Sequence, residues 1–250
     1  MCNVGRAAAG AVLGAALVAG LSEDRRRWAR GSARRVARRC GAFGDTRVAT
    51  KLLLKKAAGC LDADGVPFLL AGGGACWAYG GPFPKDFDLF VAPSDAGRAT
   101  TALEAGGFRI VRRPEEWLFQ AYEHGLKIDV VFEPAGLELR SDVFTRAARL
   151  GVDGVEMRVL RLEDVFVTRL LAVTDDTLSR FERLIEAARA LREQVDWDEV
   201  EARTTASPYA RSFLTLLRAL GVTPPSASAS MHDGLCTLPY APRRGVPTPQ

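Results

Sequence analysis

The chain has 250 residues, of which 48% are hydrophobic and 26% charged, which is ordinary for a soluble globular protein with one domain or one domain and a small appendage. Residues 1–56 hold 13 of the 34 lysines and arginines but 3 of the 30 carboxylates, so any nucleic-acid role would depend on this basic arm. The five cysteines contain no C-x-x-C pair and the histidines number two, which argues against a zinc site and a disulfide framework.

Four parts are expected along the chain. Residues 1–45 form a basic, Ala- and Arg-rich extension that is poorly ordered, and residues 46–150 form an α/β domain. Residues 151–221 form a helical C-terminal region, and residues 222–250, rich in Pro and Ser, form a disordered tail.

The apolar run at residues 7–21, AAAGAVLGAALVAGL, has two interpretations. It is either part of an Ala-rich extension or a signal peptide or membrane anchor. A membrane span needs about 20 residues, so the run gives no strong evidence for a membrane partner. Cysteine usage favours a reducing, cytoplasmic location.

Two short strands are predicted in the first half of the domain. Residues 46–65 have the spacing of an amphipathic helix, and VPFLLAGG (66–73) predicts a buried strand that breaks into glycines. GACWAYGG then predicts a short helix or turn, and DFDLFVAP (86–93) a second strand. A helix over 94–107 is expected to begin with Ser94 as its N-cap.

Three further strands and four helices complete the expected layout. FRIVRR, WLFQAYEHG and LKIDVVFEP are the strand candidates, the last two joined at His124-Gly125 like a hairpin. After a less regular stretch, apolar residues three and four apart predict helices in RVLRLEDVFVTRLLAVT, TLSRFERLIEAARALREQV, DWDEVEARTT and SPYARSFLTLLRALG.

Three aspartates lie within apolar strand segments. Asp86 and Asp88 flank Phe87, so both carboxylates point the same way while Phe87 points into the core. Two like charges side by side need a cation, and Mg²⁺ prefers oxygen ligands. Asp129 in KIDVVF has the same context, and if the two strands pair, three carboxylates can hold two metals for a displacement at phosphorus. Exposed turn positions are the alternative for Asp86 and Asp88.

Glycines and basic residues supply the other half of the pattern. Gly72, Gly73 and Gly74 follow a strand and precede a short helix, so their backbone N–H groups can approach an anion, although any tight turn has such glycines. Lys85 either contacts phosphate or lies on the surface. Arg169 is a further candidate for phosphate, with a solvated helix arginine as the favoured interpretation.

The stretch LAGGGACWAYGGPFPKDFDLFV, with the later KIDVVF, resembles the nucleotidyltransferase superfamily, which includes polymerase-beta-like enzymes, aminoglycoside nucleotidyltransferases and bacterial abortive-infection toxins. The resemblance implies an α/β (α+β) fold in which a mixed sheet is flanked by helices, with a helical C-terminal part. It implies that Gly72 and Gly73 hold a nucleoside triphosphate, that Asp86 and Asp88 bind both metals, and that Asp129 completes the site. The Lys-Asp pair of the toxin branch is missing from AVTDDTLSRFERL, which weakens a toxin assignment.

The expected function is that of a Mg²⁺- or Mn²⁺-dependent nucleotidyltransferase. Such an enzyme moves a nucleoside monophosphate from a nucleoside triphosphate to a hydroxyl group of a small molecule, a tRNA or a protein, and releases pyrophosphate. The alternative is a catalytically silent module on the same fold that binds nucleotide or RNA.

Overall fold

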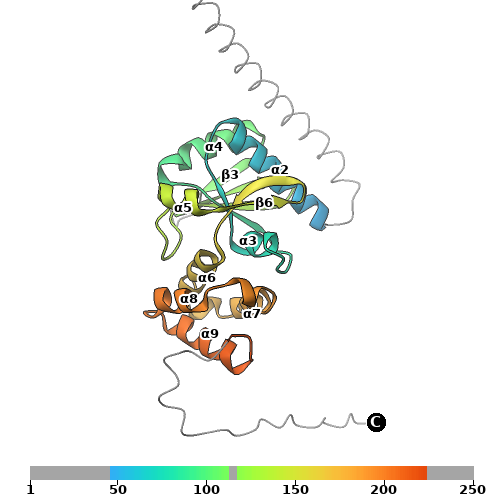
Figure 1. The fold of residues 1–250 in the computed structure, drawn as a ribbon. Coiled ribbons are helices and arrows are strands. Elements are labelled where there is room, and N and C mark those ends of the chain that lie inside the picture. Colours follow the sequence, from blue (N-terminus) through green and yellow to red (C-terminus); the bar gives the residue numbers. More distant parts are fainter. Residues whose placement is uncertain (1–45, 113–116, 224–250) are drawn as a thin grey trace, which may run out of the picture.

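The computed structural model describes residues 46–112 and 117–223 (Figure 1). The basic extension at 1–45, including the apolar run at 7–21, and the tail from residue 224 onwards lie outside the described residues. In the described part of the chain, no helix has the length and apolar character to cross a membrane.

Strands of the described residues form one mixed sheet of seven, in the order β3-β4-β5-β2-β1-β7-β6. β2 is parallel to β5 and β1 is parallel to β7, while the other neighbours are antiparallel. The strands are β1 (Leu69–Ala71), β2 (Phe87–Phe90), β3 (Arg109–Arg112), β4 (Leu118–Glu123), β5 (Leu126–Val131), β6 (Ala148–Val152) and β7 (Val155–Val159). The expected α/β class with a mixed sheet is confirmed.

The central strands β2 and β5 carry one fully apolar face. Phe87 and Leu89 alternate with Asp88 along β2, and Ile128 and Val130 alternate with Asp129 along β5; the four apolar side chains are 0% exposed. Helices α2 (Thr46–Ala63) and α4 (Ala96–Ala105) lie together on one side of the sheet (Figure 1). The aspartates therefore face away from the main core.

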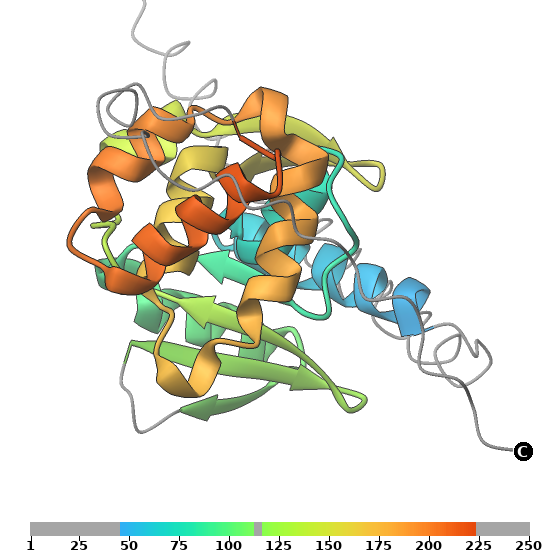
Figure 2. The same ribbon diagram turned by 90° about the horizontal axis from the view of Figure 1, so that it is seen from below.

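The C-terminal helices lie on the opposite side of the sheet from α2 and α4 (Figures 1 and 2). They pack around α6 (Leu162–Leu171), whose buried side chains include Val165, Phe166 and Leu170. The remaining helices are α3 (Gly72–Ala78), α5 (Ser141–Arg146), α6 (Leu162–Leu171), α7 (Arg180–Leu191), α8 (Trp197–Thr204) and α9 (Pro208–Ala219).

Two local predictions differ from the structure. The less regular stretch contains the β6–β7 hairpin, which turns at Asp153 and Gly154 with φ of 48° and 83° and extends the sheet across residue 150. Residues 158 and 159 thus belong to β7, and α6 begins at Leu162. Pro93–Asp95 form a short 3-10 turn before α4, and Ser94 does not cap that helix.

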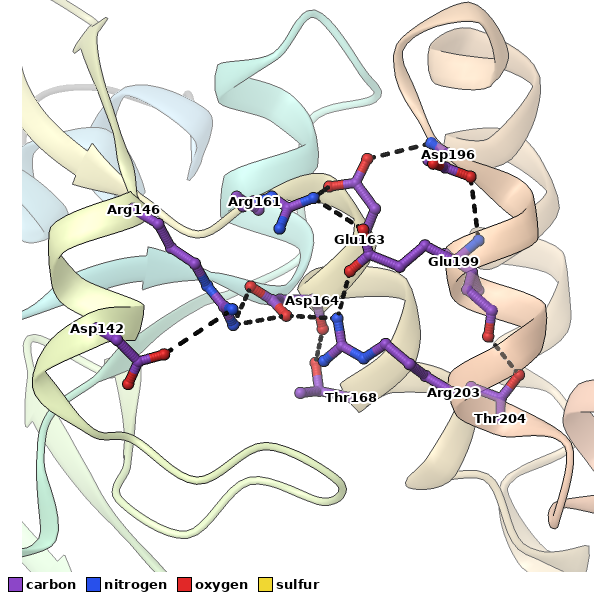
Figure 3. A network of polar contacts seen from close by, with 11 residues as sticks. Asp142, Arg146, Arg161, Glu163, Asp164, Thr168, Asp196, Glu199, Arg203 and Thr204 are labelled. Carbon is purple, nitrogen blue, oxygen red and sulfur yellow. Dashed lines mark hydrogen bonds and ion pairs between the residues drawn. The ribbon is translucent and has the colours of Figure 1, made fainter.

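Asp164 of α6 is fully buried and joins the two sides of the molecule (Figure 3). Its carboxylate lies 3.0 Å from Arg146 Nη2 of α5 and 2.8 Å from Arg203 Nη1 of α8. Arg203 also pairs with Glu199 at 2.9 Å, and Glu199 pairs with Arg161 at 2.9 Å. A continuous network of ion pairs therefore fixes α6 between the sheet side and the helical side.

Candidate active site

The three aspartates come together through strand register. Asp88 and Asp129 are direct neighbours across the parallel β2–β5 pair, and Ala71, at the end of β1, is the neighbour of Asp88 on its other side. Asp86 stands two residues before Asp88 and lines the same cavity. The geometry places the carboxylates on one face of the sheet, as the spacing of the sequence predicts.

Gly72 fits directly against the carboxylate of Asp88. Its φ is +53°, and a Cβ atom at this position would lie 2.0 Å from Asp88 Oδ2. Only glycine combines this left-handed backbone with so close an approach. The turn after β1 is therefore shaped around the aspartate of the neighbouring strand.

The other two glycines have different surroundings. Gly73 lines the cavity with Gly72, and a Cβ there would meet Pro84 at 3.0 Å. Gly74 is buried, and its missing side chain makes room for Leu70 and Phe87, each 2.7 Å from a would-be Cβ. The structure thus brings Gly72 and Gly73 to the site and places Gly74 in the core.

Lys127 supplies a positive charge between two of the carboxylates. Its Nζ lies 2.8 Å from Asp86 Oδ2 and is hydrogen-bonded to Asp129 Oδ2. Although burial opposes it, the hydrogen bonds to Asp129 and Asp86 raise the pKa of Lys127. Sequence reasoning missed this residue, although the period of two in Lys127-Ile128-Asp129 placed it on the same strand face as Asp129.

Gln120 of β4 completes the surroundings of Asp129. Its Nε2 donates to Asp129 Oδ1 at 2.7 Å, and Tyr122 donates to Gln120 Oε1 at 2.8 Å. The tyrosine thereby fixes the amide with its donor end toward the aspartate. Both oxygens of Asp129 are therefore engaged by side chains of its own sheet.

Asp88 has no cation in direct contact with it among residues 46–112 and 117–223. Burial, followed by the negative charges of Asp86 and Asp129, raises the pKa of Asp88 to about 7, against the weaker opposing effects of Arg169 and Lys127. This shift shows that the three carboxylates interact electrostatically. Added positive charge near Asp88 would therefore be favourable.

The aspartates open into a cavity of about 560 Å³ between the sheet and the helices α6 and α7. Lys85 lines it from the loop before β2 and is exposed. Arg169 lines it from α6 with a partly exposed side chain whose Nη1 lies 3.8 Å from the sulfur of Cys76, and its role as a phosphate contact stays a prediction. Arg180 and Arg183 of α7 line it too, although their sequence context gave no reason to select them.

The donor set suits a hard cation in its chemistry. Asp88 and Asp129 offer carboxylate oxygens on paired strand positions and Asp86 offers its own from just before β2, and their mutual repulsion favours a divalent ion. Within residues 46–112 and 117–223, however, no three His, Cys, Asp or Glu side chains are grouped closely enough to hold a metal. The ammonium group of Lys127 engages two of the candidate ligands instead.

Comparison with known proteins identifies a family that matches this chain. The uncharacterised nucleotidyltransferases match the chain over residues 20–221. The chain belongs to this family. No curated protein matches the sequence. The expected resemblance to nucleotidyltransferases is thereby confirmed.

Several solved structures are similar to this nucleotidyltransferase. The solution structure of the antibiotic-resistance factor ANT(2'')-Ia has 16% identity and a TM-score of 0.47, over 70% of this chain and 98% of that one. The crystal structure of ANT(2'')-Ia in complex with adenylyl-2''-tobramycin has 18% identity and a TM-score of 0.45, over 66% and 97%. JHP933 from Helicobacter pylori has 14% identity and a TM-score of 0.37, over 72% and 93%.

Proposed function

We propose that the protein transfers a nucleoside monophosphate from a nucleoside triphosphate to a hydroxyl acceptor, with Mg²⁺ or Mn²⁺ at the three aspartates. The observation that carries the proposal is the register of β2 and β5, which sets Asp88 beside Asp129 and against Gly72. Family membership assigns the chain to proteins named for nucleotidyl transfer.

Each side of the cavity has a distinct role in this proposal. Gly72 and Gly73 let the triphosphate approach the backbone closely, because neither carries a side chain on the cavity wall. Arg169 and Lys85 supply positive charge for phosphate oxygens from two further directions. Positioning of this kind and charge neutralisation provide most of the catalysis in phosphoryl transfer.

Asp86, Asp88 and Asp129 would hold the divalent ions once the ammonium group of Lys127 leaves Asp86 and Asp129 and the three carboxylates move closer together. When bound, such ions neutralise the triphosphate and lower the pKa of the acceptor hydroxyl. Asp129 is suited to orient the acceptor or take its proton, because Gln120 fixes its carboxylate at 2.7 Å. Positive charge near Asp88 would offset the repulsion from Asp86 and Asp129.

The acceptor is proposed to be something other than a polycation. Among the described residues that line the cavity, the carboxylates are the three aspartates, whereas Lys85, Lys127, Arg169, Arg180 and Arg183 are basic. Once the aspartates hold metal, no described carboxylate of the lining remains to bind a multiply charged amine.

The proposal is tested by following the label of α-labelled nucleoside triphosphates. Wild type and Asp88→Asn are incubated with each triphosphate, Mg²⁺ and total cell extract, and labelled products and pyrophosphate are measured. Wild type is expected to label an acceptor and release pyrophosphate, whereas Asp88→Asn should lose activity by several orders of magnitude, because a metal ligand is lost.

A silent binding module gives a different set of results. It would bind triphosphate, release no pyrophosphate, and show the same affinity in calorimetry with and without chelator. A wild type that behaves in this way contradicts the proposed transfer reaction. Asp88→Asn is near-isosteric, so unchanged stability of that variant excludes misfolding as the cause of lost activity.

A further inference from the structure

The ammonium group of Lys127 contacts two candidate metal ligands at once. It contacts Asp86 Oδ2 at 2.8 Å and Asp129 Oδ2, and its side chain is 30% exposed toward the cavity. β2 and β5 are parallel, and Phe87 lies beside Ile128. The residues before them, Asp86 and Lys127, therefore lie side by side in the cavity lining. The contact therefore joins Lys127 of β5 to the residue that immediately precedes β2.

These contacts use the same oxygens that a divalent ion would need. Asp129 accepts from Gln120 through Oδ1 and from Lys127 through Oδ2, so the ammonium group already lies on the oxygen that faces Asp86. Asp86 likewise accepts from Lys127 through Oδ2. A cation and the ammonium group cannot occupy the position between the two carboxylates together, because their like charges repel.

We propose that Lys127 is a resident counter-ion that competes with the divalent metal for Asp86 and Asp129 and makes metal binding depend on a triphosphate. Without an anion nearby, moving the ammonium away leaves it without a counter-charge, so metal binding is weakened. A triphosphate in the cavity offers it phosphate oxygens, so the lysine can leave the carboxylates as metal arrives. The proposal rests on the proposed metal-dependent function.

Reciprocity between the two ligands follows from this competition. If triphosphate raises the affinity for metal by a given factor, metal raises the affinity for triphosphate by the same factor. Lys127 is the physical link between them, since its ammonium can pair with carboxylate or with phosphate but not fully with both. Removing its charge should therefore tighten metal binding alone and weaken the coupling.

The test measures Mn²⁺ binding by calorimetry in wild type, Lys127→Met and the matched control Lys55→Met. Lys55 has a similar side-chain exposure of 29% and pairs with Asp153, away from the cavity. Each protein is titrated with free Mn²⁺ and with a preformed complex of Mn²⁺ and inorganic tripolyphosphate. Lys127→Met is expected to bind free Mn²⁺ at least tenfold more tightly than wild type and Lys55→Met.

The two titrations separate the possible failures. If Lys127→Met binds free Mn²⁺ no more tightly than wild type, competition by Lys127 is wrong while the metal site stands. If no protein binds Mn²⁺ in either form, the proposed function fails and this inference with it. If Lys127→Met does not fold, the test uses wild type alone. Equal affinities of wild type for free Mn²⁺ and for the complex of Mn²⁺ and tripolyphosphate would then overturn the coupling.

Discussion

Asp88 and Gly72 show how one side chain and one backbone turn define the candidate site at the scale of single residues. The carboxylate occupies the space that any other amino acid would fill with its own Cβ, 2.0 Å from Oδ2. Because the φ of Gly72 is also positive, two independent constraints act at the same position. The glycine is thus part of the aspartate's surroundings and not merely a turn residue.

Replacing Gly72 by Ala is expected to displace the Asp88 carboxylate. The left-handed backbone alone costs about 1–2 kcal/mol, and the contact with Oδ2 adds to that. Stabilisation by Mn²⁺ should shrink strongly in thermal melts. The control is Gly125→Ala. Gly125 has a φ of +79° and no atom within 4 Å of an added Cβ, so this variant has only the cost of the left-handed backbone. Equal Mn²⁺ stabilisation in both variants would contradict the prediction.

Arg169 is expected to contribute to triphosphate affinity. Arg169→Gln removes a cavity cation near Cys76 and Asp88, and a charge-assisted hydrogen bond is worth about 1.5–3 kcal/mol. Tripolyphosphate affinity measured by calorimetry should therefore fall about tenfold or more. Arg189→Gln, on α7 but outside the cavity lining, should change it little. Similar losses in both variants would point to net charge rather than to a contact.

At the scale of elements, α6 connects the stability of the fold to the site. Asp164 lies near its N-terminus in the ion-pair network, and Arg169, further along the same helix, reaches the cavity. Anything that loosens the contacts of Asp164 with α5 and α8 would also let Arg169 move.

Asp164→Asn is expected to destabilise the protein by about 3 kcal/mol, the lower end for breaking a buried ion pair, because Arg146 and Arg203 are partly exposed. For a chain of this size that corresponds to a melting temperature lower by about 6–12 °C. The matched control is Glu156→Gln, since the exposed pair of Arg149 and Glu156 at 3.0 Å should contribute less than about 1 kcal/mol. Similar melting temperatures for the two variants would contradict the role of the network.

Sequence could predict those features that depend on local periodicity. The faces of Asp86, Asp88 and Asp129 follow from alternation along strands, and the His124-Gly125 turn follows from its residue types, with φ of 49° and 79°. The Asp153-Gly154 turn carries a comparable signal that was not recognised as a hairpin. By contrast, the approach of Arg169 to the cavity depends on how α6 packs, which no local pattern encodes.

At the scale of the whole molecule, the described residues contain a complete sheet, covered on one side by α2 and α4 and on the other by the C-terminal helices (Figures 1 and 2). The cavity lies between the sheet and α6 and α7, so both are needed to enclose it. The division of the chain at 46–150 and 151–221 accordingly remains a proposal about organisation, since the β6–β7 hairpin spans residue 150.

Removing residues 1–44 is expected to leave folding intact. This segment carries a cluster of like charges and little apolar periodicity beyond its Ala-rich run. The shortened chain should melt within about 5 °C of the full chain, equivalent to roughly 1–2 kcal/mol. A larger loss would show that the segment packs on the domain. As a control, a chain ending at residue 207 lacks the buried Phe213 and Leu217 and should not fold cooperatively.

The central position of β1 has a consequence for how the protein is made. β1 pairs with β2 soon after both are synthesised, but its other edge pairs with β7, where Leu70 meets Val159. On the ribosome, that edge of a short apolar strand stays open until the β6–β7 hairpin emerges. An unpaired edge can associate with other nascent chains, and such long-range pairing is slow. Translation pauses before the β6–β7 hairpin has emerged from the ribosome should therefore promote aggregation, whereas pauses after its emergence should not.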